Sequence, residues 1–143
     1  MPEHVLEAKN FCLRLILNVF ERDIEYPINT NMTVFVTCNE FSAKTDMDID
    51  VKDFSAFSKK LMAVYRDLKG NASIKEPYGY ERFISFVADK TGHIAVKGYL
   101  CDDSRRNEMR FETIFDQTYL KRFADELLTT YCGNNRIDGK ENL

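Results

Sequence analysis

Apolar residues in this sequence recur either at every second position or at every third to fourth, and the order of these spacings limits the folds open to the chain. Alternate residues are apolar from Phe11 to Val19, as in a strand with one buried face. Comparable patterns predict further strands over residues 32–41, 72–75, 80–88, 93–101 and 108–115, and a less regular one over 43–47. Most of the chain is therefore predicted to form strands joined by short turns.

Two segments carry apolar residues at helical spacing instead. The first covers residues 50–69, where the Asp50 carboxylate can cap the free N–H groups and Gly70 is a natural left-handed terminator. The second covers about residues 118–132. Asp116 lies where the last strand pattern stops, so we expect it to cap a strand-to-helix joint rather than to act as a catalytic carboxylate.

This order of elements, strands and a helix followed by strands and a helix, predicts an α+β fold. We expect an antiparallel sheet of about six strands with two amphipathic helices packed on it, a two-layer sandwich. Residues 1–143 should form a single domain, with a short arm over 1–9, an ordered core over about 11–132 and a frayed tail over 133–143. Gly98 lies inside a predicted strand, which indicates a bulge or the close packing of a helix.

The composition argues against several classes of protein. With 44% hydrophobic and 13% aromatic residues, the chain is typical of globular proteins and not of disordered ones. Its net charge of −3 gives no basic footprint for direct binding to nucleic acid. No apolar run reaches the ~20 residues that a membrane span needs, and the N-terminal residues do not resemble a signal peptide. We therefore expect a cytoplasmic protein.

The sequence contains no recognisable catalytic, cofactor or metal motif. It lacks G-x-S-x-G, H-E-x-x-H and a glycine-rich phosphate loop, so we expect no enzymatic activity and no cofactor. His93 is expected to be structural or solvent-facing, and His4 lies in the polar arm. Four cysteines are scattered without a C-x-x-C pair, which predicts reduced, mostly buried thiols and no metal site: Cys12, Cys38, Cys101 and Cys132.

Acidic residues form the main candidate binding surface. Asp46, Asp48 and Asp50 alternate and would project from one face of an extended segment, and Asp102 and Asp103 share a turn. One interpretation is a solvated surface; the functional one is a docking patch for a basic partner such as a nuclease. Asp46–Asp50 lacks the Gly and Glu of a calcium loop, so a metal site is not expected.

Several stretches resemble one protein family in order and spacing. The stretches are "FSAKTDMDIDVKDFSAFSKKLMAVYRDLKGNASI", "DKTGHIAVKGYLCDD", "NEMRFETIFDQTYL" and "FDQTYLKRFADEL", which together span roughly residues 11–131. They are similar to the WapI-type immunity proteins, small partners of bacterial polymorphic toxins. The resemblance implies a cytoplasmic binding protein that neutralises a cognate toxin domain by stoichiometric association. The segment after Gly70 departs from the family pattern, so the identity of the toxin does not carry over.

Two alternatives stay open from the sequence. A small-ligand carrier or enzyme would need a pocket between sheet and helices, with Asp116 as its acid and three tyrosines as its lining: Tyr80, Tyr99 and Tyr119. A homodimer could instead form on the second face of the first strands, where three apolar residues stand opposite the more apolar set: Ile16, Phe20 and Phe35.

Overall fold

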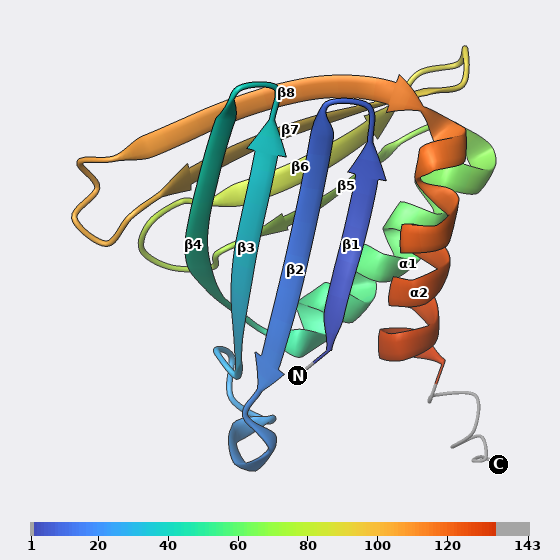
Figure 1. Cartoon of the computed structure of the whole chain (residues 1–143). Helices are drawn as coiled ribbons and strands as arrows, with labels where there is room; N and C mark the ends of the chain where they lie inside the picture. The colour runs from blue at the N-terminus through green and yellow to red at the C-terminus, as the bar shows by residue number, and fades with distance from the viewer. Residues whose placement is uncertain (1, 134–143) are drawn as a thin grey trace, which may run out of the picture.

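The structure is a computed structural model that describes residues 2–133. It consists of four strands and a helix, followed by four more strands and a second helix (Figure 1). The elements are, in chain order, β1 (Glu3–Ala8), β2 (Phe11–Val19), η1 (Glu21–Asp23), β3 (Thr30–Cys38), β4 (Phe41–Ile49), α1 (Val51–Asp67), β5 (Asn71–Lys75), β6 (Phe83–Ala88), β7 (His93–Cys101), β8 (Glu108–Asp116), η2 (Gln117–Tyr119) and α2 (Lys121–Cys132).

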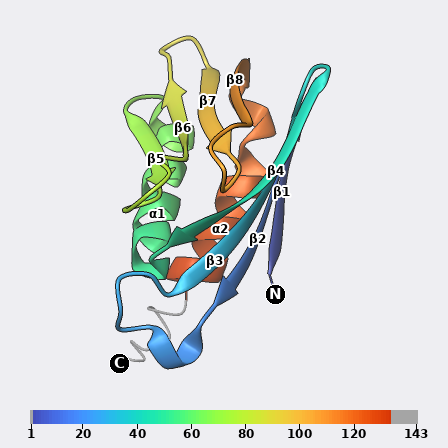
Figure 2. The same cartoon turned by 90° about the vertical axis from the view of Figure 1, so that its left-hand side faces the viewer.

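The strands form two four-stranded antiparallel sheets, in the orders β1-β2-β3-β4 and β5-β6-β7-β8. Two-residue turns join β1 to β2 and β3 to β4, and Asn10 and Asn39 take positive φ angles of 59° and 55° there. Asn tolerates this left-handed conformation better than most residues. The sheets face each other, and their strands cross steeply (Figures 1 and 2).

The two helices close one side of the space between the sheets. α1 packs against β5 and β6, α2 packs against β1, and the helices pack on each other. Figure 1 shows them side by side at the edge formed by β1 and β5. On the opposite side β4 meets β7, and β3 meets β8, without an intervening helix. We call this line of contact between the sheets the seam.

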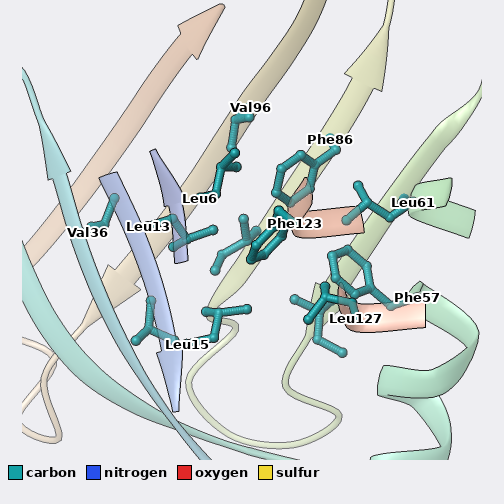
Figure 3. Close-up of a cluster of buried hydrophobic side chains, with 14 of the residues drawn as sticks. Leu6, Leu13, Leu15, Val36, Phe57, Leu61, Phe86, Val96, Phe123 and Leu127 are labelled. Carbon is teal, nitrogen blue, oxygen red and sulfur yellow. The ribbon is translucent and has the colours of Figure 1, made fainter. Parts of the chain in front are cut away.

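One core fills the space between sheets and helices. Phe57 of α1, Phe86 of β6 and Phe123 of α2 form a chain of rings, with centroid distances of 5.9 and 6.4 Å. Figure 3 shows that side chains from both sheets point toward these rings. Three inward residues of β2 are at most 1% exposed: Leu13, Leu15 and Leu17. The core thus unites the two halves of the chain.

The α+β class is confirmed, but the structure has eight strands in two sheets where about six in one sheet were predicted. β1 lies within the predicted arm, where His4, Leu6 and Ala8 point inward between exposed residues. The residues over 43–47 form part of a full strand, β4. Of the predicted frayed tail, only Gly133 is among the described residues.

Side-chain caps begin α1 and the 3₁₀ turn η2, which leads into α2, whereas α2 itself has no side-chain cap. Asp50 Oδ1 accepts a hydrogen bond from the Lys52 backbone N–H at 2.8 Å, and α1 begins between them at Val51. Asp116 Oδ1 accepts one from the Thr118 N–H at 2.9 Å. The second cap begins the 3₁₀ turn η2, so α2 starts at Lys121, three residues later than the predicted Thr118.

His4 joins β1 to α2 in the interior. It is 3% exposed, its Nδ1 lies 2.7 Å from Glu126 Oε1, and its Nε2 lies 2.8 Å from the Tyr131 hydroxyl. The two rings meet edge to face at 5.3 Å. Burial, and secondarily the Glu126 charge, raise the pKa of Tyr131, so its hydroxyl stays protonated at neutral pH. These contacts fix β1 against the C-terminal helix.

Tyr131→Phe should lower the free energy of unfolding by about 1 kcal/mol, because it removes one partner of a buried hydrogen bond. Urea denaturation measures this difference. Tyr78→Phe is the matched control, since the Tyr78 side chain is 66% exposed and should tolerate the same change without loss. Equal effects of the two substitutions would mean that the His4–Tyr131 hydrogen bond adds nothing to stability.

Candidate functional site

The seam is held together by contacts between strands of different sheets. The Thr45 hydroxyl of β4 donates to the Cys101 carbonyl of β7 at 2.8 Å. The Cys38 thiol of β3 lies 3.8 Å from the Glu112 carbonyl of β8. Because β4 and β8 are both edge strands, each presents unpaired backbone groups at this line.

Arg82 is the central side chain of the seam. It precedes β6, is 2% exposed, and its Nε donates to the Cys101 carbonyl at 2.9 Å. Nη1 donates to the Asp46 carbonyl and lies 3.3 Å from Glu76 Oε2, and Nη2 donates to Asp103 Oδ1 at 3.1 Å. The guanidinium therefore ties β4 to β7 and to the β7–β8 loop.

Arg82 and Glu76 also cover part of the β4 edge. The two-residue turn makes Cys38 and Phe41 the first bonded pair, so even-numbered residues of β4 point their backbone groups away from β3. Arg82 binds the Asp46 carbonyl, and Glu76 Oε2 accepts from the Asp48 N–H at 3.0 Å. These two side chains thus form hydrogen bonds with the β4 backbone that a neighbouring strand would otherwise form.

Glu76 is a buried member of this group whose carboxylate is only partly hydrogen-bonded. Its side chain is 2% exposed, and Oε1 has no hydrogen-bond partner within residues 2–133. Burial raises the pKa of the carboxyl, while the Asp48 N–H and the Arg82 charge act in the opposite direction. The Arg82–Glu76 pair is therefore a buried ion pair whose carboxylate depends on Arg82.

The structure places the candidate carboxylates in two kinds of environment. Asp46 and Asp48 are exposed on the outer face of the first sheet, where they accept hydrogen bonds from the side chains of Thr33 at 2.8 Å and Asn31 at 3.2 Å. Asp50 instead caps α1 and accepts from the Asn29 side-chain amide at 3.0 Å.

The carboxylates of the β7–β8 loop also differ from each other. Asp103 is 91% exposed and pairs with Arg82, so it lies beside the strand that carries Asp46 and Asp48. Asp102 orders its own loop: it accepts hydrogen bonds from the Asn107 side chain at 2.6 Å and from the Ser104 hydroxyl at 2.7 Å. These bonds lower the pKa of Asp102 to about 2.

Asn107→Ala should raise the pKa of Asp102 toward its ordinary value of 3.8, because the Asn107 side chain is the largest cause of the shift. An NMR titration of the Asp102 carboxyl carbon reads this directly. Since the folded-state pKa lies below the ordinary value, the ionised carboxylate favours the folded loop above about pH 4, and this contribution is lost as the pH falls toward about 2. An unchanged titration midpoint in the variant would contradict this role of Asn107.

Sequence reasoning did not identify Glu76 or Arg82. The sequence does contain a signal for them. Arg82 lies an even number of positions from the buried Ile84 and Phe86, and Glu76 likewise from the buried Ala72 and Ile74, so both charged residues fall in line with a buried strand face. A charged residue on the buried face of a strand must be paired. Two of opposite sign, placed one residue beyond the ends of the neighbouring strands β5 and β6, indicate an internal ion pair.

The structure does not assemble the pocket of the carrier or enzyme alternative. Tyr80 stacks on Arg82 at 4.1 Å and lies with Tyr99 beside an outer hollow of about 370 Å³. Tyr119 is 46% exposed and packs on Phe115, and neither it nor Asp116 lines that hollow. The Thr118 backbone N–H lowers the pKa of Asp116, which suits a cap.

The remaining candidate residues are distributed over the surface. His93 is half exposed, and its Nδ1 lies 2.9 Å from the Thr91 hydroxyl. Phe35 lies on the outer face of the first sheet under Arg14, at 4.5 Å, and Phe20 is 39% exposed. Within residues 2–133, no group of three or more His, Cys, Asp or Glu side chains is placed to hold a metal ion. None of the helices in this part of the chain has the length and apolar character to cross a membrane.

The fold and the seam define a class: a small α+β protein with one closed core, two sheets and a charged line of contact between them. Within residues 9–130 the sequence matches the model of the Immunity protein WapI-like family, and the chain belongs to that family. The resemblance predicted from the sequence motifs is thereby confirmed.

Comparisons with curated proteins and with solved structures add no further assignment. A search of curated proteins finds no significant match. One similar solved structure is titled as crystal structures of Trypanosoma brucei MRP1/MRP2, at 9% sequence identity and a TM-score of 0.49, over 92% of this chain and 85% of the other.

Proposed function

We propose that this protein, as a single domain in the cytoplasm, neutralises a cognate toxin domain by stoichiometric binding through the seam. Membership of an immunity protein family supports an immunity role. The observation that carries the choice of surface is the pairing of exposed Asp103 with buried Arg82, which also holds the strand bearing Asp46 and Asp48. Arg82 thus binds the Asp103 carboxylate directly and, through the Asp46 carbonyl, the strand that carries the exposed Asp46 and Asp48 side chains.

Such a surface suits a basic partner. Asp46, Asp48 and Asp103 are exposed, so they can steer a positively charged toxin such as a nuclease and select its orientation. Because the carboxylates belong to ordered strands and a hydrogen-bonded loop, little conformational entropy is lost on binding. Binding would block the toxin's active site or its substrate groove.

The decisive experiment is co-expression with the toxin domain encoded next to this protein. Survival of the host and co-purification of a one-to-one complex are the expected results. If the host does not survive and no complex co-purifies with any neighbouring toxin domain, the proposed function is rejected.

Reversing the charge of Asp46 and Asp48 together, as Asp46→Lys and Asp48→Lys, should slow toxin association about tenfold and reduce its dependence on salt. Surface plasmon resonance at two salt concentrations measures both effects. Asp50 is left unchanged, because it caps α1 and its loss would disturb the fold.

The matched control is Asp53→Lys with Asp67→Lys, which changes the net charge equally on exposed positions near the two ends of α1. Their effects on the helix dipole have opposite signs and should largely cancel. If both double variants slow association equally, net charge alone matters and the seam is not the docking surface.

A further inference from the structure

Among the residues that the structure describes, one half of the β4 edge is hydrogen-bonded to side chains from the second half of the chain, and the other half is not. Arg82 and Glu76 bind one outward backbone group at each of two residues, the Asp46 carbonyl and the Asp48 N–H. Ser42 and Lys44 have the same parity, so their N–H and C=O groups also point away from β3. Within residues 2–133 no side chain or strand binds these groups. This stretch is an open strand edge, which native proteins usually cover or block.

A groove runs beside this open edge. Two adjoining hollows of about 310 and 470 Å³ lie between β4 and the first half of β8, and they share Ser42, Glu108 and Met109. The first extends along Lys44 and Thr45 toward Cys101, where the seam closes. The groove is therefore a space next to unpaired backbone, bounded at one end by the contact between the sheets.

The chemistry of the groove is acidic with an apolar floor. Four carboxylates line it, against two basic side chains: Glu40, Asp102, Glu108 and Glu112, with Lys44 and Arg110. Arg110 is engaged, because its guanidinium lies 4.4 Å from the Tyr99 ring and 3.8 Å from Glu108. Phe41, which is 70% exposed, and half-buried Met109 supply apolar surface.

We propose that an extended basic segment of the partner protein adds as a strand to β4 at Ser42–Lys44 and lies in this groove. The inference rests on the proposed function and specifies its binding mode. Backbone hydrogen bonds to the open edge give the segment its direction and register. Alternate side chains of the segment are apolar toward Phe41 and Met109 and basic toward Glu40 and Glu112, as the two-residue period of a strand allows.

Amide hydrogen exchange tests the binding mode without any substitution. In the free protein the Ser42 and Lys44 amides should exchange fast, while those of Ala43 and Thr45, which bond to β3, are protected. A synthetic peptide of alternating Lys and Val should slow exchange at Ser42 and Lys44 at least tenfold, and a Glu–Val peptide of equal length should not. Unchanged exchange at saturating Lys–Val peptide overturns the proposal. Protection that rises with protein concentration without peptide also overturns it, since a second copy of the chain would then occupy the edge.

Two substitutions at one position separate backbone from side chain. Lys44→Pro removes the outward N–H, which makes no bond to β3, and should weaken binding of the Lys–Val peptide about tenfold. Lys44→Ala keeps the N–H and removes a like charge, so it should preserve or tighten binding. Equal loss in both variants, with thermal unfolding unchanged, would show that the side chain and not the strand edge binds the peptide.

The outcomes separate this inference from the proposed function. If the toxin domain co-purifies but exchange at Ser42 and Lys44 does not change with peptide or toxin, the strand-addition mode fails and the immunity role stands. If the peptide protects both amides but no neighbouring toxin binds, the groove is a peptide site and the proposed function fails.

Discussion

Replacing Arg82 by methionine is expected to lower the free energy of unfolding by about 3–5 kcal/mol. Methionine fills much of the volume, but it leaves the Glu76 carboxylate buried without its counter-charge and removes the bonds to the Asp46 and Cys101 carbonyls. For a chain of this size the melting temperature should fall by about 10 °C or more. Chemical denaturation and thermal unfolding measure the two quantities.

The control for Arg82→Met is a double variant that also removes the unpaired charge of Glu76. Glu76→Gln combined with Arg82→Met should recover part of the lost stability, because no buried charge is then left unpaired. The defect of Arg82→Met alone should also shrink as the pH falls, since burial already raises the pKa of Glu76 and a protonated carboxyl needs no counter-charge. A defect that is constant with pH and unrelieved by Glu76→Gln would show that lost packing, and not the lone carboxylate, is responsible.

Gly98→Val should lower the free energy of unfolding by about 3 kcal/mol. Gly98 pairs with Phe111 across β7 and β8, and the Phe111 ring lies over the glycine. A Cβ at position 98 would lie 2.5 Å from Phe111 Cε1 and closer still to Cζ. The ring is 5% exposed and packs near Phe11 at a centroid distance of 6.1 Å, so it cannot move aside freely.

Gly98→Ala with Phe111→Leu is the compensating pair, because the smaller side chain makes room for one added methyl group. We expect the double variant to be more stable than Gly98→Ala alone when both are measured by urea denaturation. If Phe111→Leu adds its own full penalty to that of Gly98→Ala, the ring is not what excludes a side chain at position 98.

Much of the fold follows from local pattern. The alternation that begins at Phe11 and the helical spacing between Asp50 and Gly70 each correspond to an element of the structure, because one buried face imposes its period on the sequence. Gly98 was expected to mark a bulge or a closely packed helix. The close contact is instead with the Phe111 ring, because a glycine pattern shows that space is short but not which group fills it.

The number of sheets could not be obtained from local pattern. A strand with one buried face has the same period whether it joins one sheet or another, so nothing in the alternation separates β4 from β5. β1 shows no clear alternation in the sequence, because its outward residues include the apolar Val5 and its inward residues include the polar His4. Its burial depends on Glu126 and Tyr131, more than 120 residues away.

The candidate site was predictable only in part. Acidic residues on an alternating segment are visible in the sequence, and Asp46 and Asp48 do lie on one exposed face. That Asp103 lies beside them depends on Arg82, which reaches across three segments. Pairings of this kind are a property of the tertiary fold, so the sequence indicates them only by placing Arg82 and Glu76 in line with the buried faces of the adjacent strands β6 and β5.

The hairpin order of both sheets has a consequence for how the chain reaches its native state. Every ladder joins strands that are neighbours in sequence, so each sheet can grow by short loop closures of low entropic cost. We expect the contacts between distant residues, such as those of His4 with Glu126 and Tyr131, to form last, when the two halves associate. The folding rate should therefore respond more to changes within a hairpin, and the unfolding rate to changes at the interface of the halves.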